Sequence, residues 1–117
     1  MKSYRDLIVW NKSVNMVTLV NALIKNFPSD EKFGLTSHIK RSSVSIPSNI
    51  AEGFGRNYTK DYARFLQISR GSLFEMQTQL QIAVNLGVIY ENELTEIKSL
   101  SIEVEKMLNV LIKKMLN

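Results

Sequence analysis

Apolar residues recur along most of the chain at intervals of three and four residues, the spacing that lines one face of an α-helix. In the first stretch a heptad-like row is joined by further apolar residues that widen it well beyond one face. The row and its additions are Leu7, Trp10, Val14, Val17, Ile24, Met16, Leu19, Val20, Leu23 and Phe27. So wide an apolar surface predicts a helix that is buried on two sides, against its own bundle and against a partner.

A second apolar row keeps a helical period through a proline. The row is Leu35, Ile39, Ile46, Ile50 and Phe54. Pro47 removes one backbone hydrogen-bond donor and opposes a helix by about 3 kcal/mol, so the stretch is either two helices or one kinked helix. Because the row keeps its phase across Pro47 and no turn residues precede it, the pattern predicts one helix, bent near Ser43, whose carbonyl the proline ring crowds.

Two further rows predict two more helices. In the third stretch, core positions alternate at spacings of four and three residues, the seam of a coiled coil. The third row is Tyr62, Phe65 or Leu66, Ser69, Leu73, Met76, Leu80, Ala83 and Gly87, with the regular spacing from Ser69 onward. The fourth row is Leu94, Ile97, Leu100 or Ser101, Val104, Leu108, Leu111 and Met115. The small residues Ser69, Gly71 and Ser72 predict that another backbone approaches the middle of the third helix closely, since glycine within a helix otherwise costs about 1 kcal/mol.

Between these apolar rows lie short turns, which are marked by residues that commonly begin or end helices. Asp6 and Thr59 are predicted N-caps, while Pro28 and Gly87 end the first and third helices. The predicted helices cover about residues 6–27, 31–56, 59–87 and 91–116. Because short connections force consecutive helices to run antiparallel, we expect one all-α domain over residues 1–117, an up-down-up-down four-helix bundle.

The composition fits one cytoplasmic domain and excludes several kinds of site. The chain has 117 residues, no cysteine and one histidine, His38. Disulfides, thiolate metal sites and clusters of histidine ligands within one chain are therefore excluded. The N-terminal sequence shows no signal peptide, and no stretch approaches the roughly 20 apolar residues that cross a bilayer, so no membrane contact is expected.

The net charge of +4 is unevenly spread along the sequence. Residues 1–72 contain eleven Lys and Arg against five Asp and Glu, whereas residues 73–117 contain four against six. The front half is therefore the part expected to meet an anion such as nucleic acid. The alternative is that a small helical protein is simply mildly basic.

No arrangement of catalytic or metal-binding residues is recognisable. A di-metal site in a helix bundle needs Glu-x-x-His motifs from facing helices, and the chain contains none. The serines lie outside any G-x-S-x-G elbow, and G-F-G-R at 53–56 lacks the lysine and the preceding strand of a phosphate loop. We therefore predict no catalytic residue, no cofactor and no metal, and a protein that is not an enzyme.

Basic residues flank the turn between the second and third predicted helices. Arg56, Lys60 and Arg64 are each four residues apart, so a helical continuation would place them together. The candidate nucleic-acid contacts are Lys40, Arg56, Lys60 and Arg64. Such contacts bind phosphates without reading sequence, and Tyr58 and Phe54 offer nearby faces for stacking. The alternative is a set of salt bridges within the bundle together with solvated lysines.

A second polar group is predicted to lie inside the bundle as part of its structure. Its members are Arg41, Asn49, Glu52, Arg70 and Glu75. Carboxylates close to apolar rows need partners to remain charged, so Glu52 and Glu75 are expected to be partly buried and paired with Arg41, Arg64 or Arg70. On this interpretation Glu52→Ala mainly lowers the melting temperature or disrupts assembly.

Several of these stretches resemble a known family. They are L-I-V-W (7–10), F-P-S-D-E-K-F-G-L (27–35), I-K-R-S-S-V-S-I-P-S-N-I-A-E-G (39–53) and F-L-Q-I-S-R-G-S-L-F-E-M-Q-T-Q-L (65–80). They are similar to bacterial four-helix-bundle proteins first noticed as reading frames in intervening sequences of 23S ribosomal RNA genes. The resemblance covers nearly the whole chain, and His38 stands where members commonly have glutamine.

The resemblance implies a four-helix bundle that assembles as a pentameric ring. A related group, the accessory variability proteins of diversity-generating retroelements, are basic pentamers that bind nucleic acid and a reverse transcriptase. Together with the basic front half, this implies a non-catalytic homo-oligomer that binds structured RNA or another nucleic acid. The alternative is a protein-interaction scaffold, in which the ring presents a surface to a protein partner.

Overall fold

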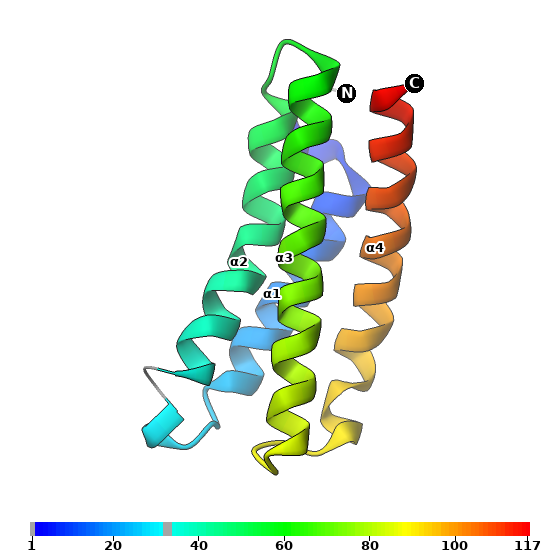
Figure 1. Cartoon of the computed structure of the whole chain (residues 1–117). Helices are drawn as coiled ribbons and strands as arrows, with labels where there is room; N and C mark the ends of the chain where they lie inside the picture. Colours follow the sequence, from blue (N-terminus) through cyan, green and yellow to red (C-terminus); the bar gives the residue numbers. More distant parts are fainter. Residues whose placement is uncertain (1, 32–33) are drawn as a thin grey trace.

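Four α-helices make up the fold in the part of the chain that the computed structural model describes, residues 2–31 and 34–117. They are α1 (Ile8–Ile24), α2 (Leu35–Phe54), α3 (Thr59–Asn85) and α4 (Thr95–Leu116), with short 3-10 turns η1 (Tyr4–Asp6), η2 (Ser29–Glu31) and η3 (Glu91–Leu94). Consecutive helices pack together and run in opposite directions, and α4 packs against α1 to close the bundle (Figure 1). The predicted all-α, up-down arrangement of four helices is confirmed. None of these described helices is long and apolar enough to cross a membrane.

The first helix begins later than predicted because a 3-10 turn precedes it. The carboxylate of Asp6 accepts hydrogen bonds from the backbone N–H groups of Lys2 (3.0 Å) and Ser3 (3.2 Å). It therefore completes the capping box of η1 and does not cap α1. The backbone of Leu7 is extended, and α1 begins at the next residue, Ile8.

The predicted starts of the second and third helices also change. Thr59 is the first residue of α3 and Tyr58 takes the N-cap position, so the predicted cap is wrong by one residue. The predicted start of the second helix near residue 31 falls in η2, and residues 32–33 lie outside the described residues. Within the described part, α2 begins at Leu35.

Helix α2 continues through Pro47, so the prediction of one helix in place of two is confirmed. Ile39, Ile46 and Ile50 have no exposed surface, which means that the apolar row faces the core on both sides of the proline. Burial of each such side chain contributes about 1.5–3 kcal/mol, and the three together outweigh the ~3 kcal/mol cost of the proline. The bend near Ser43 stays a prediction.

Helices α2 and α3 approach each other closely along a seam of small residues. The Ser69 hydroxyl donates a hydrogen bond to the backbone carbonyl of Ile46 (2.9 Å), so a side chain of α3 reaches the backbone of α2 directly. The hydroxyl oxygens of Ser45 and Ser72 lie 2.9 Å apart across the same seam. The close approach predicted at Ser69 and Ser72 is confirmed.

Two glycines of this helix pair have opposite environments. A methyl group at Gly53 would lie 2.8 Å from the Cβ atom of Phe65 and 3.2 Å from the backbone carbonyl oxygen of Tyr62. At Gly53 the two helices therefore lie too close together for a side chain to fit without a shift. A methyl group at Gly71 would meet no atom within 4 Å, so the predicted close approach at Gly71 is wrong within this chain.

The end of α3 is made by Gly87, as predicted. Its φ of 75° lies in the left-handed region that favours glycine. The N–H of Gly87 donates to the carbonyl of Val84 (3.0 Å), and the N–H of Val88 donates to the carbonyl of Ala83 (2.9 Å). These two hydrogen bonds form a Schellman motif, which satisfies carbonyl groups at the helix end and turns the chain toward α4.

The wide apolar surface of α1 is mostly covered by the chain's own core. Val9, Met16, Val20 and Ile24 are buried, and Trp10, Leu19 and Leu23 pack half-buried against them. Ile8, 64% exposed, is the large apolar residue of α1 that remains outside. Most other exposed large apolar residues lie on α3, its C-cap and α4: Ile68, Phe74, Ile82, Leu86, Ile102, Val110 and Leu116. The chain's own core thus covers one side of α1, and burial of α1 against a partner stays a prediction.

The two glycines provide a matched pair of substitutions. We expect Gly53→Ala to destabilise the protein by about 1–3 kcal/mol, because the added methyl group must displace α3. Gly71→Ala is expected to stabilise it by about 0.5–1 kcal/mol, because the site is open and alanine is the better helix former. Urea denaturation at several protein concentrations measures both, and equal effects would contradict the described contact.

Candidate nucleic-acid interface

The four predicted nucleic-acid contacts separate into two places. Arg56, Lys60 and Arg64 lie together at the connection between α2 and α3. Lys40 lies on α2, sixteen residues before Arg56 in the sequence. This separation corresponds to roughly 24 Å along the helix axis. The structure therefore supports a cluster of three and leaves Lys40 outside it.

Two of the three clustered residues, Arg56 and Arg64, lie over the same aromatic ring. The guanidinium carbon of Arg56 lies 4.6 Å from the ring centre of Phe65, and that of Arg64 lies 4.8 Å from the same centre. Arg56 also donates a hydrogen bond to the carboxylate of Glu52 (Nη2–Oε1, 2.7 Å), an exposed pair one helical turn apart. Among the described residues, Lys60 and Arg64 form no ion pair, so their charges face the solvent.

The two predicted stacking residues also differ. Phe54 packs edge-on against Tyr62, with ring centres 6.2 Å apart, so its ring is part of the α2–α3 contact. Burial raises the pKa of the Tyr62 hydroxyl above its ordinary value, so this group adds no negative charge at physiological pH. Tyr58, at the tip of the connection, is 72% exposed. Only Tyr58 of this pair presents a free aromatic face.

The predicted internal polar group is wrong for three of its four charged members. Arg41, Glu52 and Glu75 are exposed, and Glu75 accepts a hydrogen bond from the amide of Gln79 one turn later on α3 (3.2 Å). Burial would remove water from each carboxylate, whereas the helix surface leaves it hydrated. Half-buried Arg70 donates to the side-chain oxygen of Asn109 on α4 (2.9 Å), and so links two helices.

Uncharged residues provide the polar groups that the core does contain. Half-buried Asn49 donates to the carbonyl of Ser45 (2.8 Å), as a residue of the α2–α3 seam. The buried polar side chains are Ser13, Ser42, Ser43, Ser69 and Ser101. A buried serine hydroxyl can donate a hydrogen bond to a carbonyl of its own helix, so no charge has to be buried. Ser43 donates in this way to the carbonyl of Lys40 (3.0 Å). Their positions within the apolar rows are the sequence signal that identifies them.

The antiparallel topology gathers basic residues at one end of the bundle. Figure 1 shows both chain termini at the same end as the α2–α3 connection, here named the basic end. Its basic side chains are Lys2, Arg5, Arg56, Lys60, Arg64, Lys113 and Lys114, and its acidic ones are Asp6, Glu52 and Asp61. The seven basic groups outnumber the three acidic groups, so this end carries a net positive charge.

The opposite end, here named the acidic end, carries the reverse charge. It is formed by η2, η3 and the neighbouring helix ends. Its acidic side chains are Asp30, Glu31, Glu91, Glu93 and Glu96, and its basic ones in the described chain are Lys25, Lys40 and Lys98. In the folded chain, positive and negative charge are thus separated between the two ends of the bundle. They are not separated between the front and back halves of the sequence.

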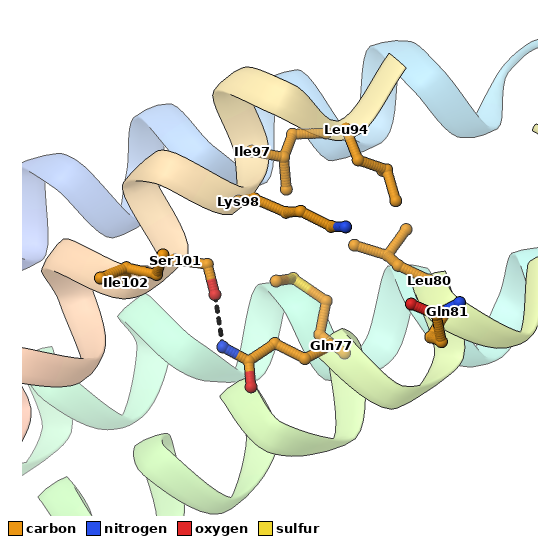
Figure 2. Close-up of a pocket in the computed structure, with 9 residues that line it drawn as sticks. Gln77, Leu80, Gln81, Leu94, Ile97, Lys98, Ser101 and Ile102 are labelled. Carbon is orange, nitrogen blue, oxygen red and sulfur yellow. Dashed lines mark hydrogen bonds between the residues drawn. The ribbon is translucent and has the colours of Figure 1, made fainter. Parts of the chain in front are cut away.

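A separate cavity of about 280 Å³ lies between α3 and α4. Figure 2 shows Leu80, Leu94 and Ile97 around it, with the amide of Gln77 donating to the hydroxyl of Ser101 (2.5 Å). The cavity is mainly apolar and contains no pair of titratable groups that could exchange a proton. Among the described residues, no three His, Asp or Glu side chains come close enough together to hold a metal ion.

Comparisons with known proteins agree with this fold. The model of the 23S rRNA-intervening sequence protein family matches residues 5–110. A solved structure from Bacteroides thetaiotaomicron, described as a protein of unknown function from the S23 ribosomal protein family, is 26% identical. It aligns with a TM-score of 0.83 over 91% of this chain and 99% of its own. A search of curated proteins gave no match. The chain belongs to the 23S rRNA-intervening sequence protein family.

Proposed function

We propose that this chain is a non-catalytic, self-associating four-helix bundle that binds nucleic acid in the cytoplasm through its basic end. The observation that carries the proposal is the charge at that end, where seven basic side chains stand against three acidic ones. A cationic surface of this kind binds phosphate groups and releases counterions, which gives affinity without sequence specificity. Structured RNA or another nucleic acid is therefore the proposed ligand.

The cluster of Arg56, Lys60 and Arg64 is the centre of the proposed interface. Lys60 and Arg64 carry no competing ion pair in the described chain. The guanidinium groups of Arg56 and Arg64 both lie against the ring of Phe65. An arginine that is held over a ring loses less conformational freedom when it binds a phosphate than one that is free in solvent. The cluster is therefore a better phosphate site than the isolated Lys40.

An apolar groove supports the proposal of self-association. The groove lies between the start of α1 and the second half of α4, and it has a volume of about 350 Å³. Its lining residues are Leu7, Ile8, Val9, Lys106, Met107, Val110 and Leu111. Ile8 and Val110 are 64% and 67% exposed, and exposed apolar surface of this kind commonly marks a protein contact.

We propose that a second copy of the chain covers this groove, in a homo-oligomer that the family resemblance suggests is a pentamer. Repetition of the basic end in every copy would then increase avidity without any new type of contact. A scaffold that holds a different protein in the groove, and binds no nucleic acid, is the second candidate function.

The triple variant Arg56→Gln, Lys60→Gln, Arg64→Gln is expected to bind structured RNA more weakly than the wild type. Loss of three phosphate contacts lowers the slope of log affinity against log salt by about 2–3 for each bound chain. Filter binding over a salt series measures affinity and slope together.

The matched control is Lys25→Gln, Lys40→Gln, Arg41→Gln, which removes the same charge away from both the basic end and the groove. It is expected to bind nearly as well as the wild type. An equal loss in the control would contradict the basic end as the interface. A wild type that shows no binding at low salt, or no dependence on salt, would contradict nucleic-acid binding itself.

Glu52→Gln is expected to strengthen RNA binding about two- to fivefold, because it releases Arg56 from its carboxylate partner and removes a negative charge. The pair is exposed, so the free energy of unfolding should change by no more than about 0.5 kcal/mol. Binding and urea denaturation measured on the same sample test both statements. A loss of stability above about 2 kcal/mol would instead give Glu52 the structural role that the sequence suggested.

Light scattering at micromolar concentration is expected to give about five times the chain mass of 13.4 kDa. Val110→Glu places a charge in the groove and should reduce this mass, whereas Val44→Glu makes the same change at an exposed apolar residue outside the groove and should not. A monomeric wild type would contradict the ring, and equal effects of the two variants would contradict the groove as its contact.

A further inference from the structure

We propose that Tyr58 stacks on an unpaired base, so that the chain prefers single-stranded or looped RNA to duplex. This inference rests on the proposed nucleic-acid binding at the basic end and names the form of nucleic acid that the site selects. The side chain lies at the tip of the α2–α3 connection and is 72% exposed, between Arg56 and Lys60 in the sequence.

The other aromatic rings near this connection are already in use. Phe54 and Tyr62 pack edge-on against each other, and both guanidinium groups of the cluster cover Phe65. Tyr58 has no such ring contact among the described residues. It is therefore the aromatic face that a base could reach without displacing a contact of the fold.

Tyr58 also occupies a position where a tyrosine side chain contributes little to the stability of the fold. It is the N-cap of α3, with extended φ and ψ of −116° and 139°, and its side chain makes no capping hydrogen bond. Ser, Thr, Asp or Asn at an N-cap usually improves the folding equilibrium about fivefold over a residue that cannot cap. The exposed tyrosine provides neither a cap nor a buried ring, so the fold alone does not account for it. A role in binding a ligand does.

The charges around Tyr58 decide which ligand suits the ring. A strand whose base stacks on Tyr58 has phosphates on both sides of that base, and Arg56 and Lys60 lie two residues before and after the ring. A peptide or lipid tail would match the ring but not a pair of flanking cations. The chain contains a natural comparison in Tyr90, which is 80% exposed at the acidic end beside Glu91 and Glu93, where phosphates are repelled.

Duplex and single strand differ in what they can offer this ring. In a duplex the base faces are already stacked, and exposing one requires an extruded nucleotide at a considerable cost in free energy. A duplex would therefore use the cations alone. A single strand adds one base–tyrosine stack, which is worth about 5- to 150-fold in affinity.

Fluorescence anisotropy with an unstructured 20-nucleotide RNA and a blunt RNA duplex of the same sequence tests the inference on the full chain. Tyr58→Ser is expected to weaken single-strand binding at least fivefold and to leave duplex binding within twofold of wild type. Tyr58→Phe keeps the ring and should bind as the wild type does, and Tyr90→Ser should change neither affinity. Serine is a good N-cap, so Tyr58→Ser should unfold at the same or a higher urea concentration.

Each alternative gives a different result. Equal weakening of single strand and duplex by Tyr58→Ser, or no weakening of either, would overturn the stacking role while nucleic-acid binding stands. A fall in oligomer mass for Tyr58→Ser would make Tyr58 a protein contact and would also overturn it. A wild type that binds neither probe at low salt removes the proposed function, and the stacking role with it.

Discussion

The contact between α2 and α3 at Gly53 is the constraint on which the rest of the candidate site depends. The absence of a side chain at Gly53 lets the ring of Tyr62 and the Cβ atom of Phe65 lie against the backbone of α2. Phe65 in this position supports Arg56 and Arg64. A wider separation of the helices would remove the shared ring and with it the reason for the two guanidinium groups to lie together.

The same contact explains how a helix with an internal proline is tolerated. Pro47 cannot donate to the carbonyl of Ser43, but the apolar residues on either side of it are completely buried. The Ser69 hydroxyl donates to the carbonyl of Ile46 (2.9 Å), next to the proline, which ties α3 to α2 at that level. The interface between α2 and α3 therefore does two things. It stabilises the centre of the helix pair, and it positions Arg56 and Arg64 at the end of the pair.

The sequence predicts the helices well because their signal is local, and the site less well because its signal is not. The row through Ile39, Ile46 and Ile50 predicts the buried face of α2, since spacing of three and four residues places these side chains on the same side. Whether Glu52 is exposed depends on which face of α2 is covered by α3. The residue pattern of α2 alone does not predict that face. The basic end joins residues from both termini and the middle of the chain, so only the antiparallel arrangement reveals it.

The central claim is that nucleic acid meets the bundle end-on, at the basic end. Ultraviolet cross-linking of the full chain to a single-stranded RNA, followed by mass spectrometry of the linked peptides, tests it most directly. Cross-links concentrated in residues 54–65, with Tyr58 among the linked residues, are the predicted result. Cross-links concentrated at residues 86–98 of the acidic end, or spread evenly over the helix surfaces, would contradict it.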